Sequence, residues 1–218
     1  MPKNNDAGEI KIEKETALSA RINGNQNQAM VIVKKALKVV LEKAKASGIG
    51  IAGTFFNTVT SSGAIGYVAS EIIRQDLVRL VFASSPPRVA TAGSYEPIFG
   101  TNPLAIGIPA KSNSIVLNMT TQLLWPFTGV ACSGVGDNSK NWGHLVFAID
   151  PGFLGNRDEF INNVTTLIKN VKATKKLPET GEIFVPGEKG NRQSKQIRTS
   201  GKIEIEENLL QELRKMAG

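Results

Sequence analysis

The first strong pattern in the sequence is a helical alternation of apolar and lysine positions between residues 29 and 47. Apolar side chains recur there every three or four residues, and lysines occupy positions between them. This spacing predicts an amphipathic helix that packs by its apolar face. Gly48 follows directly and is expected to end the helix. The apolar positions are Val33, Ala36, Leu37, Val40, Leu41 and Ala44.

Shorter apolar runs further along the chain predict strands, and longer periodic segments predict helices. We expect strands at residues 49–56, 78–83, 104–109, 115–118, 146–150 and 202–205, and helices at 63–75, 158–172, 191–199 and 206–216. The elements do not alternate strictly, which favours an α/β fold of mixed α+β character. We interpret residues 1–24 as a polar N-terminal extension that precedes one domain over residues 25–218. In the closing helix, the spacing of Leu209, Leu210 and Leu213 predicts a packed apolar face.

Composition and charge narrow the class of protein. Apolar residues make up 41% of the chain, which is enough for a hydrophobic core. No stretch approaches the roughly 20 apolar residues of a membrane span, so we expect no membrane segment and a cytoplasmic location. The formal charge is +7, but no nucleic-acid-binding motif accompanies the lysines, so we expect no nucleic-acid partner. With Cys132 as the only cysteine and no suitable ligand spacing elsewhere, we expect no metal site.

The string GIGIAG at residues 48–53 matches the pattern G-x-G-x-x-G of dinucleotide-binding Rossmann folds. That motif needs a strand before it and a helix after it, because the phosphates bind at the N-terminus of the helix. Here a predicted helix precedes the string and a predicted strand follows it. We therefore interpret Gly48 as a helix stop and do not expect a Rossmann fold.

Three longer strings are more specific. They are SPP from Ser85, EPIFGTNPLAIGIPA from Glu96 and GHLVFAIDP from Gly143. Together with KALKVVLEKAKASGIGIAG, which ends at Gly53, they resemble the malate/L-lactate dehydrogenase family. That family includes sulfolactate and ureidoglycolate dehydrogenases and diketogulonate reductase. The resemblance covers roughly residues 20–216.

The resemblance implies the family's own α/β fold on a mixed sheet, a nicotinamide cofactor and usually a dimer. The cofactor would be NAD or NADP, and the substrate a small 2-hydroxy or 2-oxo acid. Ser85, in the SSPP turn, stands where relatives contact the cofactor, although its position before two prolines equally suits a plain turn residue. Thr101 and Asn102 are expected mainly to close a turn. The other implied cofactor-binding residues are Asn118, Met119 and Thr120, where relatives have LDMAT, and the PGE turn of Pro186, Gly187 and Glu188.

The chain also departs from the family pattern at its expected catalytic centre. Ser61 stands where the family has its catalytic histidine, and a serine cannot exchange a proton near neutral pH as imidazole does. The family's earlier histidine-bearing DSHGV-type segment has no counterpart in the short N-terminus. An internal deletion near residues 121–123 removes the stretch with the HKGYG-type motif. For His144, the sole histidine, we favour packing or hydrogen bonding over catalysis.

Two functions therefore stay open from the sequence. The first is an oxidoreductase that transfers hydride between a nicotinamide cofactor and a 2-hydroxy or 2-oxo acid, with its activity reduced or lost. The alternative is a non-catalytic relative, a binding or structural subunit that forms a homodimer or partners a full-length paralogue.

Overall fold

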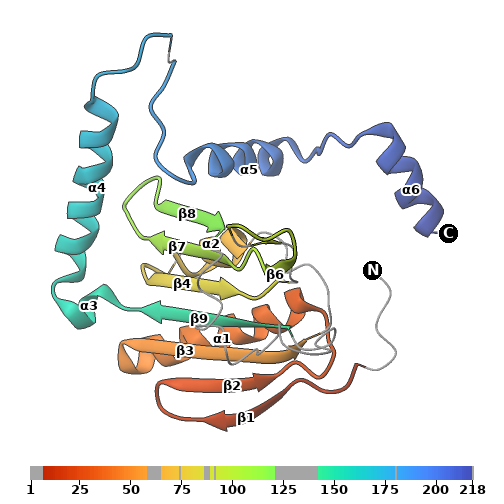
Figure 1. The fold of residues 1–218 in the computed structure, drawn as a ribbon. Helices are drawn as coiled ribbons and strands as arrows, with labels where there is room; N and C mark the ends of the chain where they lie inside the picture. Colours follow the sequence, from red (N-terminus) through yellow and green to blue (C-terminus); the bar gives the residue numbers. More distant parts are fainter. Residues whose placement is uncertain are drawn as a thin grey trace.

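A seven-stranded mixed sheet forms the body of the protein (Figure 1). The computed structural model describes residues 7–57, 65–73, 75–85, 89–90, 92–120, 142–179 and 181–217. The strand order is β1-β2-β3-β9-β4-β7-β8, in which β2 and β3 are parallel and all other neighbours are antiparallel. The strands are β1 (Lys11–Glu15), β2 (Ser19–Asn23), β3 (Ile49–Asn57), β4 (Val78–Ala83), β7 (Pro103–Ile108), β8 (Ile115–Thr120) and β9 (Trp142–Ile149).

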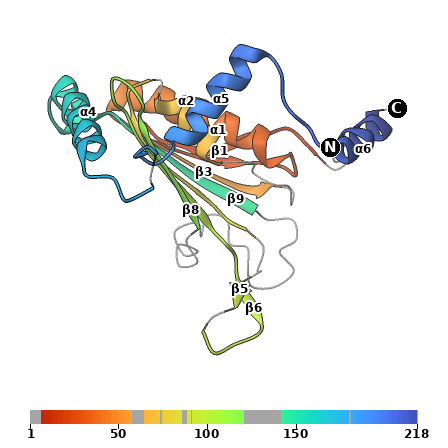
Figure 2. The same ribbon diagram turned by 90° about the horizontal axis from the view of Figure 1, so that it is seen from above.

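A small hairpin and six helices complete the described fold. The hairpin pairs β5 (Val89–Ala90) with β6 (Pro97–Phe99) and projects from one end of the sheet (Figure 2). The helices are α1 (Ala29–Ser47), α2 (Ile65–Ile73), α3 (Pro151–Leu154), α4 (Arg157–Ala173), α5 (Glu188–Ser200) and α6 (Glu207–Ala217). No helix in the described ranges has the length and apolar character that a membrane crossing requires.

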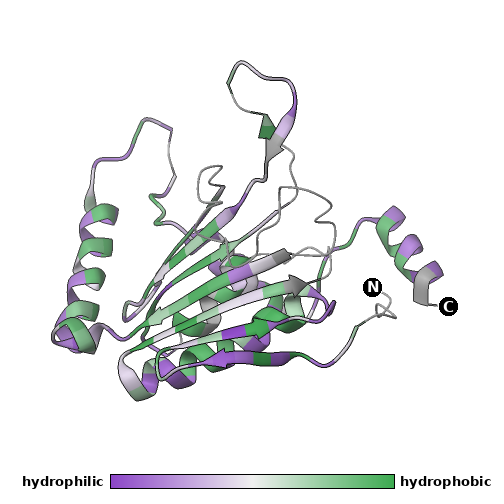
Figure 3. Cartoon of the chain, turned by 60° about the horizontal axis from the view of Figure 1, so that its bottom comes forward, coloured by the Kyte–Doolittle hydropathy of each residue, from purple (hydrophilic) through white to green (hydrophobic). Residues whose placement is uncertain are grey.

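The main core lies where α1 and α2 pack on one face of the sheet. Ile32 and Val40 of α1 and Ile72 of α2 are fully buried against Val81 of β4 and Val146 of β9. Each such side chain stabilises the fold by roughly 1.5–3 kcal/mol through the apolar surface that it removes from water. Figure 3 colours each residue by its hydropathy and shows apolar and polar residues alternating along α1. The predicted apolar face of α1 is thus confirmed.

Gly48 ends α1 as the sequence predicts. Its φ of +79° is the left-handed conformation that glycine adopts without strain, and its N–H donates to Ala44 O at 2.9 Å. The string GIGIAG therefore runs from a helix stop into β3, which confirms that it is not a Rossmann phosphate loop. The mixed α/β fold that we predicted is also confirmed.

The structure differs from the expected elements at both ends of the chain. Strands β1 and β2 lie within residues 1–24, so the second half of the polar segment is part of the sheet. The domain boundary at residue 24 stays a prediction. At the other end, residues 202–205 form no strand, and the predicted strand there is wrong. Its alternating apolar residues find no neighbouring strand to pair with in the described fold.

Candidate functional site

The ends of β4 and β8 flank the start of β7 and bring several predicted site residues to one end of the sheet. Leu104 of β7 pairs with Phe82 of β4 on one side and with Met119 of β8 on the other. Thr120 pairs with Pro103, the first residue of β7. Ser85 follows β4 by two residues. The antiparallel register therefore places Ser85, Met119 and Thr120 around the same strand end.

Ser85 is part of a closed hydrogen-bonded turn. Its Oγ lies 2.9 Å from Thr101 Oγ1 and accepts from Asn102 N at 3.0 Å, while its backbone N–H donates to Asn102 Oδ1 at 3.3 Å. Gly100 is required there, because a Cβ would lie 2.2 Å from Ser85 O. The turn-closing role expected for Thr101 and Asn102 is confirmed. A cofactor contact by Ser85 stays a prediction.

Asn118, Met119 and Thr120 form the exposed end of the edge strand β8. Asn118 lies against the first turn of α2, where a Cβ added to Gly66 would be 3.5 Å from Asn118 Nδ2. Because side chains alternate along a strand, Thr120 shares this face with Asn118, and Met119 points to the other face. The sequence did not predict that α2 begins beside Asn118.

The PGE turn contacts the same edge strand, two residues before Asn118. Pro186 O accepts from Val116 N at 3.0 Å. Gly187 has a φ of +87°, and a Cβ there would lie 2.8 Å from the Cβ of Val116. Only glycine therefore fits without displacing β8. The structure thus places Gly187 beside β8, whereas its predicted cofactor contact remains a prediction.

The Glu188 carboxylate is buried and holds the turn to α4. It accepts from Lys172 Nζ at 2.6 Å, from Val185 N at 3.2 Å and from Arg192 Nη2 at 3.3 Å. The hydrogen bond from Lys172 is the main reason that the pKa of Glu188 is lowered. Nothing in the spacing of Lys172 along the sequence indicates this pairing. A cofactor contact by Glu188 stays a prediction.

His144 lies on β9, in the middle of the sheet. Its side chain is buried, so solvent cannot reach it as it would reach a general base. It is 2% exposed, and its Nδ1 is 3.3 Å from Thr54 Oγ1, which also accepts from His144 N at 2.9 Å. Burial lowers the pKa of the imidazole to about 4, so the ring is neutral near pH 7. The packing and hydrogen-bonding role is confirmed. Ser61, at the family's histidine position, lies outside the described residues.

Comparisons with known proteins identify the family. A profile described as malate/L-lactate dehydrogenase matches residues 3–124 and 127–214. The L-sulfolactate dehydrogenase of Methanothermobacter thermautotrophicus is 26% identical over 270 residues, covering 94% of this chain and 76% of the relative. Because this alignment is longer than the 218-residue chain, the relative has stretches there without a counterpart. The malate dehydrogenase of Pyrococcus abyssi is 33% identical over 115 residues, covering 53% of this chain and 31% of the relative.

Two solved structures share the fold. The malate dehydrogenase of Pyrococcus horikoshii superposes with a TM-score of 0.82 at 22% identity, covering 95% of this chain and 76% of that one. The sulfolactate dehydrogenase of Methanocaldococcus jannaschii gives a TM-score of 0.81 at 23% identity, covering 94% and 77%. Because the family profile matches nearly the whole length of this chain, the chain belongs to the malate/L-lactate dehydrogenase family of oxidoreductases.

Proposed function

We propose that the chain binds a nicotinamide dinucleotide, NAD or NADP, at the ends of β4 and β8. Its reaction would be hydride transfer between that cofactor and a small 2-hydroxy or 2-oxo acid. One observation carries the proposal, namely that Asn118 and Thr120 converge with the turn of Ser85 and the first turn of α2. These elements come from three distant parts of the sequence.

The chemistry of these residues suits such a ligand. Hydroxyl and amide side chains both donate and accept hydrogen bonds, as the ribose and carboxamide groups of a dinucleotide require. The first turn of α2 carries no acidic residue, and the N-terminus of a helix favours phosphate. Asn118 stands where the family pattern has aspartate, and its neutral amide can both donate and accept hydrogen bonds. When bound, the cofactor would supply the hydride acceptor or donor, and these residues would orient it.

The proposed reaction also needs a group that accepts or donates a proton. Oxidation of a hydroxyl group to a carbonyl also releases a proton, which a general base accepts. His144 cannot serve, because its ring is buried between β3 and β4 and Thr54 occupies the side of Nδ1. This observation favours the second candidate function, a non-catalytic subunit that binds the cofactor or supports a partner. The partner would be a second copy or a full-length paralogue.

Titration with NADH and with NADPH, followed by fluorescence energy transfer from tryptophan, tests the binding proposal. We expect saturable binding of at least one nucleotide and about a tenfold weaker Kd for Asn118→Ala, which corresponds to about 1.4 kcal/mol. Lys45→Ala, at the exposed end of α1, is the control and should bind as the unchanged protein does. Absence of saturable binding for both nucleotides would overturn the proposal.

Turnover assays then separate the two candidate functions. Malate, L-lactate, sulfolactate and ureidoglycolate, with their oxo products, are the substrates that the names of the family and its members suggest. NADH or NADPH turnover with any of them supports the enzyme. Binding without turnover supports the non-catalytic subunit. Ser61→His restores an imidazole at the family position, and in a competent site it should raise the rate by about 10²–10⁴-fold.

A further inference from the structure

Helix α6 is amphipathic, and no other helix or strand in the part of the chain that the structure describes packs extensively against it. Leu209 and Leu213 are 49% and 42% exposed, and Leu210 is half-buried. The sequence predicts that these leucines pack, but α6 stands away from the sheet at the end of an arm that begins with α5 (Figures 1 and 2). Isolated helices shorter than about 12–15 residues are marginally stable in water, and α6 has 11 residues. Its apolar face therefore needs a surface to cover it.

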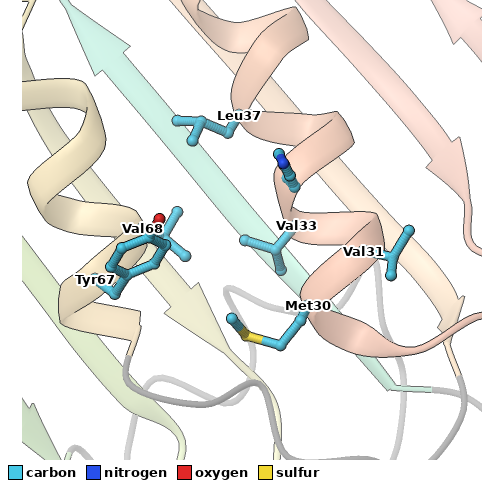
Figure 4. Close-up of a pocket in the computed structure, with 7 residues that line it drawn as sticks. Met30, Val31, Val33, Leu37, Tyr67 and Val68 are labelled. Atoms are coloured by element: carbon cyan, nitrogen blue, oxygen red, sulfur yellow. The ribbon is translucent and has the colours of Figure 1, made fainter. Parts of the chain in front are cut away.

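A matching apolar groove lies between α1 and α2. It encloses a cavity of about 500 Å³. Figure 4 shows Met30, Val33 and Leu37 pointing from α1 toward Tyr67 and Val68 of α2. Met30 and Tyr67 are 42% and 50% exposed, so the groove is open to solvent along its rim.

The dimensions of the helix and the groove agree. From Leu209 to Leu213 the apolar face of α6 spans roughly 6 Å, at about 1.5 Å per residue. From Met30 to Leu37 the wall of the groove spans roughly 10 Å by the same rise. The leucine row thus fits within the groove, with the polar ends of α6 extending beyond it.

The acidic segment that leads into α6 and the lysine-bearing start of α1 are complementary in charge, and the basic residues of α6, Arg214 and Lys215, lie in its last turn. Residues 203–212, which lead into α6 and form most of it, contain four glutamates and no basic residue. Residues 30–38 of α1, of which Lys34 lines the groove, contain three lysines and no acidic residue. Within the described ranges, none of these four carboxylates forms an ion pair in its own chain. The glutamates are Glu204, Glu206, Glu207 and Glu212, and the lysines are Lys34, Lys35 and Lys38.

We propose that α6 of one copy lies in the groove between α1 and α2 of a second copy, and that the exchange is reciprocal. The arm carries α6 away from its own sheet, which favours a second copy as the source of the groove. A reciprocal exchange uses the same two surfaces twice and closes as a two-fold dimer, so no helix or groove is left to recruit further copies.

Sedimentation velocity and light scattering on the full chain test the proposal. We expect a dimer, and we expect monomers for Leu209→Glu with Leu213→Glu on the helix and for Met30→Glu in the groove. Gln211→Glu adds a charge on the opposite face of α6, and Ala46→Glu adds one at the far end of α1. These controls should stay dimeric. A chain that is monomeric throughout, or a dimer that survives both the helix and the groove changes, would overturn the proposal.

Charge reversal tests the pairing itself. Lys34→Glu with Lys38→Glu should weaken the dimer by about tenfold, as should Glu207→Lys with Glu212→Lys. A chain that carries all four substitutions should regain most of the dimer affinity. If the two pairs of substitutions acted independently, their losses of affinity would add and the dimer would be weaker still. Additive weakening would contradict the proposed contact.

Disulfide cross-linking locates the contact. In a Cys132→Ser background, Met30→Cys with Leu213→Cys should give a covalent dimer on oxidation. Met30→Cys with Asn163→Cys, on the exposed side of α4, is the matched control and should not. A disulfide formed within one chain would show that α6 folds back on its own groove and would overturn the exchange.

Discussion

At the scale of single residues, burial of the His144 imidazole makes the stability of the fold depend on pH. Burial lowers its pKa from 6.5 to about 4, so between these values the unfolded chain binds a proton that the folded chain excludes. The free energy of unfolding should therefore be fully retained above about pH 6.5 and should fall as the pH drops toward 4. The shift corresponds to at most about 3 kcal/mol.

Urea unfolding at about pH 7 and about pH 4.5 measures this loss. His144→Gln is the control, because glutamine offers polar atoms but does not titrate. Carboxylates that titrate in the same range contribute equally to both proteins, so the difference between them isolates the imidazole. Equal losses for the two proteins would show that His144 is protonated as readily in the folded state as in the unfolded chain.

The buried carboxylate of Glu188 should matter more to stability than its exposed neighbour. Glu188→Gln removes the charge that binds Lys172 and Arg192 and leaves one amide oxygen to serve three donors. We expect a loss of roughly 1.5–3 kcal/mol, the usual range for a hydrogen bond to a charged group. Glu182→Gln alters an exposed partner of the same arginine and should cost less than about 1 kcal/mol. Denaturant unfolding compares them, and similar losses would contradict the buried role.

The sequence predicted individual residues well where the backbone alone dictates the residue type. Gly48 ends its helix as predicted, whereas the close approach of Gly187 to Val116 was found only in the structure. The partners of side chains were harder to predict. Lys172 and Glu188 are 16 positions apart in sequence, and they meet only because α4 and the PGE turn both pack near the β7–β8 edge. Contacts of this kind depend on tertiary packing, which periodicity does not encode.

At the scale of secondary structure, the start of α4 depends on one capping residue. Asn156 accepts from Glu159 N at 3.0 Å, which satisfies one of the free N–H groups of the first turn. Asn156→Ala should destabilise the protein by about 1 kcal/mol, and Asn156→Asp should retain the cap and the stability. Thermal unfolding followed by circular dichroism distinguishes them. An alanine variant as stable as the aspartate variant would mean that α4 does not depend on this cap.

Strong periodicity predicted α1 and β4 at their observed bounds, whereas the first two strands escaped prediction. Every residue of β1 is exposed, so the strand has no apolar face to reveal it. Strand β2 buries only Ala20 and Ile22 and is five residues long. Both are held by backbone pairing at the sheet edge, and that pairing leaves little trace in hydropathy. The apolar alternation at residues 202–205 was misleading for the converse reason, since none of the described strands pairs with it.

At the scale of the whole molecule, the sheet order could not be derived from local patterns. Strand β9 lies between β3 and β4, and its His144 meets Thr54 from 90 positions earlier in the sequence. Such long-range pairing is set by the packing of the whole chain, and only the resemblance to a known family indicated it. The convergence of Ser85 with the end of β8 follows from this order, so the candidate site was predicted by its residues but not by its geometry.

Binding of the proposed cofactor should stabilise the whole molecule, because a ligand that binds only the folded state shifts the unfolding equilibrium. At a concentration of about 100 times its Kd, NADH or NADPH should add about 2.7 kcal/mol. For a chain of this size that raises the Tm by about 5–10 °C. Differential scanning fluorimetry measures the shift, and Asn118→Ala should show a smaller one at the same nucleotide concentration. If neither nucleotide moves the Tm although the protein unfolds cooperatively, the ends of β4 and β8 do not form a dinucleotide site, and the role of a structural subunit gains support.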